Sequence, residues 1–208
     1  MVTTLYLIRH GATEGSEEKR YKGSIDVPLS EKGIEQIRMT TEFIRATLGD
    51  SALSAVYSSP LSRAFRSAGI MAAPFGLQPM VVSDLRERHF GIWEGMTLNE
   101  ISEKYPDEFK AWACNPLEHS PLGGESTLQV RDRIMPAYEE IVLRHPDESI
   151  AIAGHGGVNR IVLCHVLGIP LEHIFRIEQD NAAVSIINFY DKYPVVKLLN
   201  GGPPWLKP

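Results

Sequence analysis

The chain has 208 residues, of which 43% are hydrophobic and 23% charged, and this fits a globular protein with a substantial core. A formal net charge of −5 with no basic tract argues against nucleic acid as the main partner. No apolar stretch approaches the roughly 20 residues that span a bilayer, and no secretory signal is visible, so we expect no membrane association. Two cysteines, Cys114 and Cys164, are too few for a disulfide framework and fit a cytoplasmic protein.

Strand and helix patterns alternate along the first half of the chain. In chain order, they predict strand 4–8, helix 30–48, strand 53–58, helix 61–73, strand 80–82 and a loop over 83–96. Ser30 has the position of a helix N-cap, and Ile37 and Ile44 belong to one apolar stripe of the helix that follows. Pro74 marks the end of the second predicted helix.

The second half continues the alternation. It predicts short helices opening at Thr97 and Pro106, helix 126–145, strand 149–153, helix 157–167 and closing strands 183–189 and 195–199. Ser126 and Gln129 have the spacing of a capping box, and the Pro- and Gly-rich residues 201–208 are expected to form a loose tail. The whole pattern predicts an α/β fold: a three-layer α/β/α sandwich around a largely parallel sheet, in a single domain over 1–208.

Two histidines come directly after buried strands of this predicted sheet. His10 follows the first strand, and His155 follows the strand 149–153. Open α/β sheets bind ligands beyond the carboxyl ends of their strands, so we expect both histidines in one crevice. Arg9 carries a planar fork that suits phosphate, and His155 precedes Gly156-Gly157 and a predicted helix start, where free N–H groups favour an anion. These residues together indicate phosphate chemistry.

Two further charged residues lie near strand ends. Arg63 falls in the first turn of a predicted helix, where a cation is unfavourable for the helix dipole, so we expect it to face a negative ligand or partner. Glu87 lies between Arg86 and Arg88, which would keep it ionised and make it a poor acid. A bound phosphate dianion would reverse that effect by like-charge repulsion. Glu87 is therefore expected to donate a proton only when substrate is present.

Short motifs follow one another in a fixed order along the chain. They are Arg9-His10-Gly11, Tyr21-Lys22-Gly23 with residues 26–30, residues 58–64, Glu87, residues 91–95, residues 123–126, and Gly154-His155-Gly156-Gly157. In this order they resemble the histidine phosphatase superfamily, the phosphoglycerate mutase-like proteins, over nearly the whole chain. Residues 93–95 with residues 123–126 resemble the phosphatase branch that contains α-ribazole phosphatases and metal-independent phosphoserine phosphatases.

The resemblance implies hydrolysis of small phosphate monoesters through a phosphohistidine on His10, with neither metal nor cofactor. Glu87 would protonate the departing alkoxide and then activate water. The residues implied to hold the phosphate or the substrate are Arg9, Ser16, Tyr21, Lys22, Gly23, Arg63, His155 and Gly156. Residues 93–125 would form a lid over a small phosphorylated metabolite. The segment 20–22 fits a solvated loop equally well.

Two positions depart from the family pattern. The family commonly has glutamate after the Arg-His-Gly triplet, where this chain has Ala12, and many members have asparagine where this chain has Ser16. Ser16 still offers a hydroxyl that can donate a hydrogen bond to phosphate. Ala12 raises the question of what keeps the loop 12–22 ordered. Neither departure removes a residue implied in the chemistry.

Three alternatives were weighed. Metal catalysis would fit seven histidines, yet no His-Glu-x-x-His or clustered spacing occurs. A non-catalytic phospho-ligand-binding protein is a second alternative, which loss of His10, Arg63 or Glu87 would have favoured. A cofactor-dependent phosphoglycerate mutase is the third, but such mutases carry a longer segment between the acid and the second histidine. A phosphatase is therefore expected, and the sequence does not identify the alcohol that it releases. A homodimer is the default expectation for its oligomeric state.

Overall fold

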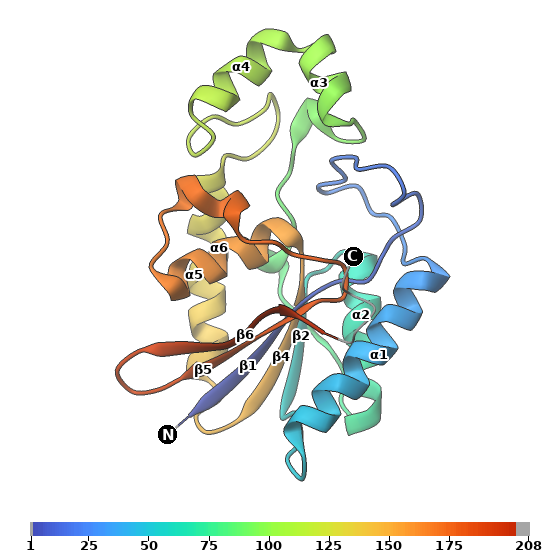
Figure 1. The fold of residues 1–208 in the computed structure, drawn as a ribbon, viewed down its shortest axis with the longest axis vertical. Coiled ribbons are helices and arrows are strands. Elements are labelled where there is room, and N and C mark those ends of the chain that lie inside the picture. Colours follow the sequence, from blue (N-terminus) through green and yellow to red (C-terminus); the bar gives the residue numbers. More distant parts are fainter. Residues whose placement is uncertain (1, 203–208) are drawn as a thin grey trace.

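A six-stranded sheet with the order β3-β2-β4-β1-β5-β6 forms the centre of the computed structural model, which describes residues 2–202 (Figure 1). Its strands are β1 (Thr3–Arg9), β2 (Ala55–Ser58), β3 (Met80–Val81), β4 (Ser149–Gly154), β5 (Val184–Phe189) and β6 (Pro194–Gly201). Strands β1 to β4 pair in parallel, and β5 and β6 pair antiparallel. The predicted largely parallel sheet is confirmed.

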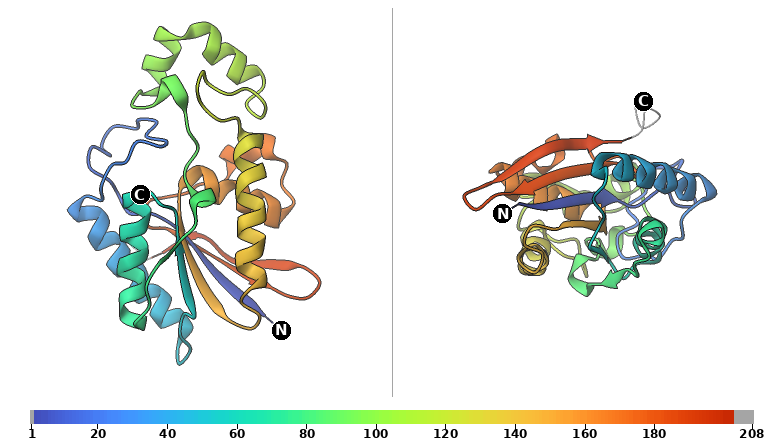
Figure 2. Two further views of the ribbon diagram at one scale, coloured as in Figure 1. Left: turned by 180° about the vertical axis from the view of Figure 1, so that it is seen from behind. Right: turned by 90° about the horizontal axis from the view of Figure 1, so that it is seen from below.

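Helices cover both faces of this sheet, as predicted. Helices α1 (Glu31–Leu48) and α2 (Ser62–Ala72) lie on one face, and α5 (Thr127–Leu143) and α6 (Gly156–Leu167) lie on the other (Figure 2). Two short helices, α3 (Leu98–Lys104) and α4 (Pro106–Cys114), lie beyond one end of the sheet (Figure 1). No helix in the described part of the chain is long and apolar enough to cross a membrane.

Local sequence signals set the beginnings of several helices. The Ser30 hydroxyl accepts a hydrogen bond from Gly33 N–H (3.1 Å) at the start of α1, and Ser126 forms a full capping box with Gln129 at the start of α5. Helix α6 has no side-chain cap, because its N-cap residue is His155. Its first N–H groups are therefore available to other partners near the end of β4.

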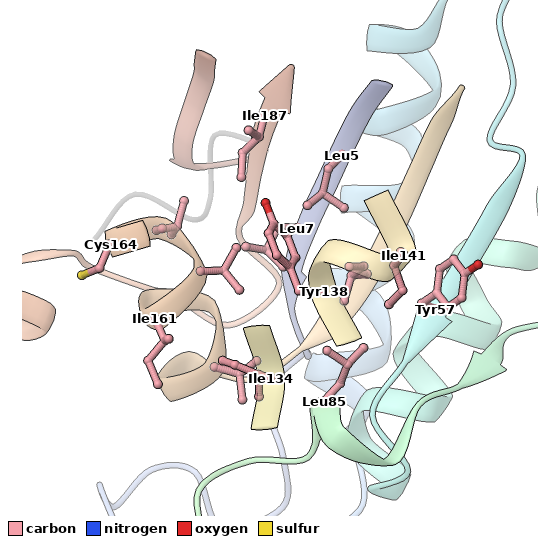
Figure 3. Close-up of a cluster of buried hydrophobic side chains, with 14 of the residues drawn as sticks. Leu5, Leu7, Tyr57, Leu85, Ile134, Tyr138, Ile141, Ile161, Cys164 and Ile187 are labelled. Carbon is pink, nitrogen blue, oxygen red and sulfur yellow. The ribbon is translucent and has the colours of Figure 1, made fainter. Parts of the chain in front are cut away.

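The core is divided between the two faces of the sheet. Leu5 and Leu7 of β1 pack with α5 and α6, as the close-up in Figure 3 shows, whereas Tyr6 and Ile8 pack with α1 and α2. Burying each such side chain stabilises the fold by about 1.5–3 kcal/mol relative to exposure. Because β1 is buried on both faces, its sequence is a continuous apolar run rather than an alternating one.

Three predicted boundaries differ in the structure. Helix α2 ends at Ala72, and Pro74 lies in a separate 3₁₀ turn, Ala73–Phe75. The predicted loop 83–96 contains the 3₁₀ turns Ser83–Leu85 and Gly91–Trp93. Strand β6 continues to Gly201, which pairs with Val184, so the predicted tail begins inside the sheet; residues 203–208 lie outside the described part.

Candidate active site

The two histidines lie side by side because of the register of β1 and β4. Arg9 pairs with Gly154 across the two parallel strands, and the next residue on each strand is a histidine. The imidazole rings of His10 and His155 have their centroids 5.2 Å apart. The backbone N–H of His10 donates to the backbone oxygen of Gly154 (3.1 Å). Both side chains are buried. The predicted meeting of the two histidines at one edge of the sheet is confirmed.

His10 presents a neutral ring with a defined tautomer. Its Nδ1 lies 2.7 Å from Gly11 O, and because a carbonyl only accepts, Nδ1 carries the proton and Nε2 keeps its lone pair. Burial lowers the pKa of His10 well below its usual value, and the positive charges of Arg9 and Arg63 lower it further. Gly11 itself packs closely against the start of α1, where a Cβ on it would lie 2.3 Å from Gly33 O.

Two arginines bring positive charge close to the histidines. Arg63 is buried in the first turn of α2 and donates to Gly23 O (2.6 Å) and Ile25 O (2.7 Å). Arg9 donates through Nη1 to Gln179 O (2.5 Å), while its buried Nε has no hydrogen-bond partner. Among residues 2–202, neither guanidinium forms an ion pair with a carboxylate. This geometry is consistent with the expectation that Arg63 faces a negative ligand or partner.

His155 is held by a residue that the sequence analysis did not single out. Its Nε2 lies 2.7 Å from Ser59 Oγ, and that oxygen also accepts from Leu61 N–H (3.2 Å). Among the described residues the Ser59 hydroxyl has no other acceptor, so its proton goes to Nε2 and His155 carries its own proton on Nδ1. Nδ1 is buried without a partner, as is Arg9 Nε. Buried donors without acceptors are rare in proteins, and those of Arg9 and His155 are consistent with a site for an anion.

Glu87 faces the same site, but its neighbours differ from the prediction. Its carboxylate accepts from Gly157 N–H at the start of α6 (3.1 Å) and from Arg88 N–H (2.9 Å). The side chain of Arg88 instead donates to Glu125 O (2.7 Å), and Arg86 lies nearest to Asp84 and Glu125. Neither flanking arginine forms an ion pair with Glu87 within the described chain, because successive side chains of an extended segment point in different directions.

These groups line one cleft of about 610 Å³. Of the predicted residues, Arg9, His10, Ser16, Tyr21, Lys22, Gly23, Arg63, Glu87 and Gly156 contribute to its surface, and His155 lies buried behind it. Lys22 is oriented by Thr13 Oγ1 and by Glu14 O (2.9 Å). His155 is thus the one predicted site residue that does not line the cleft, although its ring lies beside that of His10.

The loop after His10 is ordered without the glutamate common in the family. Ala12 N–H donates to Gln36 Oε1 (2.9 Å), and Ala12 O accepts from Ser30 N–H (3.0 Å), so helix α1 anchors the first residues of the loop. Further on, Tyr21 N–H donates to Met96 O (2.8 Å), and the Tyr21 ring packs on Phe90 at 4.9 Å between centroids. The loop is thereby joined to the segment that was predicted as a lid.

The outer part of the cleft combines aromatic rings with charged and polar side chains. Trp93 and Trp112 lie 5.9 Å apart between ring centroids, and Trp112 lies 6.3 Å from Phe175 of the segment Leu171–Arg176. The lining residues that the sequence analysis missed include Val130, Arg160, Ile161, Ile174, Phe175, Glu178, Gln179, Asp180 and Asn181. Most come from helix faces or from the connection after α6, which carries no motif. Within residues 2–202, no three His, Cys, Asp or Glu side chains are grouped so that they could hold a metal ion.

Comparisons with known proteins agree with this geometry. Residues 5–201 match the model of the histidine phosphatase superfamily (branch 1). The chain is 32% identical to phosphoserine phosphatase 1 of Hydrogenobacter thermophilus, over 94% of this chain and 91% of that protein. It is 36% identical to a metal-independent phosphoserine phosphatase of Arabidopsis thaliana, over 90% and 74% of the two chains. A mycobacterial glucosyl-3-phosphoglycerate phosphatase superimposes with a TM-score of 0.83 at 26% identity, over 97% and 100%.

Proposed function

We propose that this chain, which belongs to the histidine phosphatase superfamily, hydrolyses phosphate monoesters of small metabolites with His10 as the nucleophile and Glu87 as the proton donor. Relatives named as phosphoserine and glucosyl-3-phosphoglycerate phosphatases support the class of reaction. The observation that carries the assignment is the neutral His10, with Nε2 unprotonated, beside buried donors on Arg9 and His155 that have no acceptor.

In the first step, His10 Nε2 attacks phosphorus and the ester P–O bond breaks. The ring becomes positively charged, and Gly11 O, which accepts from Nδ1, stabilises that charge. Arg9, Arg63 and the Nδ1–H of His155 offset the negative charge on the phosphoryl oxygens in the transition state. Glu87 gives its proton to the leaving oxygen, so the alcohol departs neutral.

In the second step, water hydrolyses the phosphohistidine. Glu87, now a carboxylate, takes a proton from the attacking water, and the P–N bond breaks to return neutral His10 and inorganic phosphate. The two backbone N–H groups of Gly157 and Arg88 keep the carboxylate oriented through both steps. One residue thus serves as acid and then as base.

Replacing the nucleophile tests the assignment directly. His10→Ala should abolish turnover while leaving the fold intact, because Gly11 O, which accepts from the His10 ring, also accepts from Asn181 Nδ2 (3.4 Å). Rapid quenching of the wild-type reaction without acid should trap an acid-labile phosphoryl group on His10. Near-normal turnover by His10→Ala would refute the mechanism.

The substrate is proposed to be a small phosphorylated metabolite, and the outer cleft would contact the alcohol that leaves. Apolar rings of Trp112 and Phe175 lie there together with the charged residues Arg160, Glu178 and Asp180. A turnover screen covers phosphoserine, 3-phosphoglycerate, α-ribazole phosphate and aryl phosphates. It distinguishes leaving groups that pair with the charged residues of the cleft from leaving groups that pack on its aromatic rings. Residues 93–125 are proposed to cover the bound substrate.

Two further expectations stay predictions. The chain is expected to be cytoplasmic and to form a homodimer, and light scattering after size-exclusion chromatography measures the second.

The alternatives of a cofactor-dependent mutase and of a non-catalytic phospho-ligand-binding protein are separated by product analysis, since only the phosphatase releases inorganic phosphate in every turnover.

A further inference from the structure

Arg133 uses every N–H of its guanidinium group around the segment that carries Glu87. Its Nη1 donates to Asp84 O (2.6 Å) and Arg86 O (2.8 Å), and its Nη2 donates to Glu87 O (3.1 Å). The remaining donors reach the Glu125 carboxylate, from Nε at 2.7 Å and from Nη2 at 2.9 Å. An arginine has five N–H donors in a fixed fork, and all five are satisfied here.

Glu125 holds the backbone on the other side of Glu87, and we call Arg133 and Glu125 together the clamp. Its Oε2 accepts from His89 N–H (2.9 Å), and its own N–H donates to His89 O (2.8 Å). Burial opposes the ionised form of Glu125, but hydrogen bonds from Arg133 and His89 outweigh this effect and lower its pKa below the usual value. The backbone is therefore held at residues 84, 86 and 87 by Arg133, and at residue 89 by Glu125.

This clamp acts on the backbone and leaves the Glu87 carboxylate to the active site. The carboxylate itself contacts Gly157 N–H at the start of α6, whereas Arg133 lies on α5 with its side chain only 12% exposed. Arg133 does not line the cleft, although its positive charge contributes to the lowered pKa of His155. Its contacts with the catalytic machinery run through the main chain of residues 84–87.

We propose that Arg133, with Glu125, is a positioning residue that sets the place of the Glu87 proton donor relative to the leaving oxygen. This inference rests on the proposed role of Glu87. Proton transfer requires the donor and the receiving atom to lie within hydrogen-bond reach, and a displacement of about 1 Å can cost about 10²-fold in rate. Lysine cannot replace the arginine, because a point ammonium cannot donate to three carbonyls and one carboxylate at once.

The leaving group reveals whether Arg133 acts through Glu87. An alkyl alkoxide needs a proton as the P–O bond breaks, whereas a nitrophenolate departs readily without one. Phosphoenzyme formation is measured in the pre-steady state, by alkaline rapid quench for an alkyl ester found in the turnover screen and by the nitrophenolate burst for p-nitrophenyl phosphate. Arg133→Gln should slow the alkyl reaction by about 10²-fold and the nitrophenyl burst by less than about 3-fold.

Three further variants and a control complete the experiment. Arg133→Lys, which keeps the charge and loses the fork, should show the same selectivity and replaces Arg133→Gln if the latter does not fold. Arg131→Gln on the same helix should leave both rates unchanged, because among residues 2–202 Arg131 pairs only with its exposed neighbour Asp132. Glu87→Gln should slow the alkyl ester by about 10²–10⁴-fold, and adding Arg133→Gln to it should slow that ester little further.

The outcomes separate the two proposals. If Glu87→Gln slows both esters equally, the proton-donor role in the proposed function is wrong. If Glu87→Gln is selective but both Arg133 variants slow the two esters equally or not at all, Arg133 is a structural tie and the inference fails. Selectivity in Glu87→Gln and in the Arg133 variants, with non-additive effects in the double variant, supports it.

Discussion

Lowering the pH should destabilise the protein through two buried histidines. The pKa values of His10 and His155 lie well below the usual 6.5 in the folded state, because both rings are buried; the neighbouring ring and the arginines at positions 9 and 63 add to the effect. In the unfolded chain both rings titrate near 6.5. Below that pH the unfolded state binds two protons that the folded state does not. Their contribution to stability is therefore complete above pH 6.5 and is lost as the pH falls below it.

The size of the effect follows from the number of protons. Each site changes the free energy of unfolding by up to about 1.36 kcal/mol per pH unit. With both rings neutral in the folded protein down to pH 5, each histidine contributes a loss of about 2 kcal/mol between pH 7 and pH 5, and both together about 4 kcal/mol. A typical domain has about 5–15 kcal/mol of stability, so the loss is a large fraction of the total.

Urea unfolding at pH 7 and pH 5 measures this loss. His10→Gln and His155→Gln cannot take up the proton, so each should reduce the difference between the two pH values by about 2 kcal/mol, and the double variant by about 4 kcal/mol. Carboxylates contribute equally to all four proteins and cancel in the comparison. A pH dependence unchanged in the double variant would refute the reasoning, since the rings would then be protonated inside the folded protein.

Three other expectations concern the reaction and the loop after His10. Hydrolysis should survive exhaustive chelation, and vanadate should inhibit it; loss of activity with EDTA and its return with a divalent ion would contradict the two-histidine mechanism. With 3-phosphoglycerate and a bisphosphorylated primer, inorganic phosphate should form faster than the isomer; the reverse would favour a mutase. Gly33→Ala should destabilise the fold by about 3 kcal/mol in urea unfolding, because its Cβ would lie 1.9 Å from Ala12 O. Gly69→Ala, in open space on α2, is the matched control and should be neutral or stabilising by up to about 1 kcal/mol.

The strands, the helix starts and the meeting of the two histidines were predictable because their causes are local or follow from one general rule. The apolar run of β1 identifies a strand buried on both faces, and the Ser126 capping box opens α5 with backbone groups only three residues away. Once the sheet is parallel, the carboxyl ends of β1 and β4 lie at one edge, so His10 and His155 are brought together without any further information.

The surroundings of Glu87 were decided by the tertiary structure alone. The sequence places Glu87 between Arg86 and Arg88, yet its carboxylate contacts Gly157 N–H, 70 residues away along the chain, and its backbone is held by Arg133. Likewise, Ser59 orients His155 across 96 residues. Side-chain direction in an extended loop depends on which elements pack around it, and neither periodicity nor neighbouring charge encodes that packing. The sequence therefore determined which residues stand at the strand ends, and the packing of α5 and α6 decided how those residues are held.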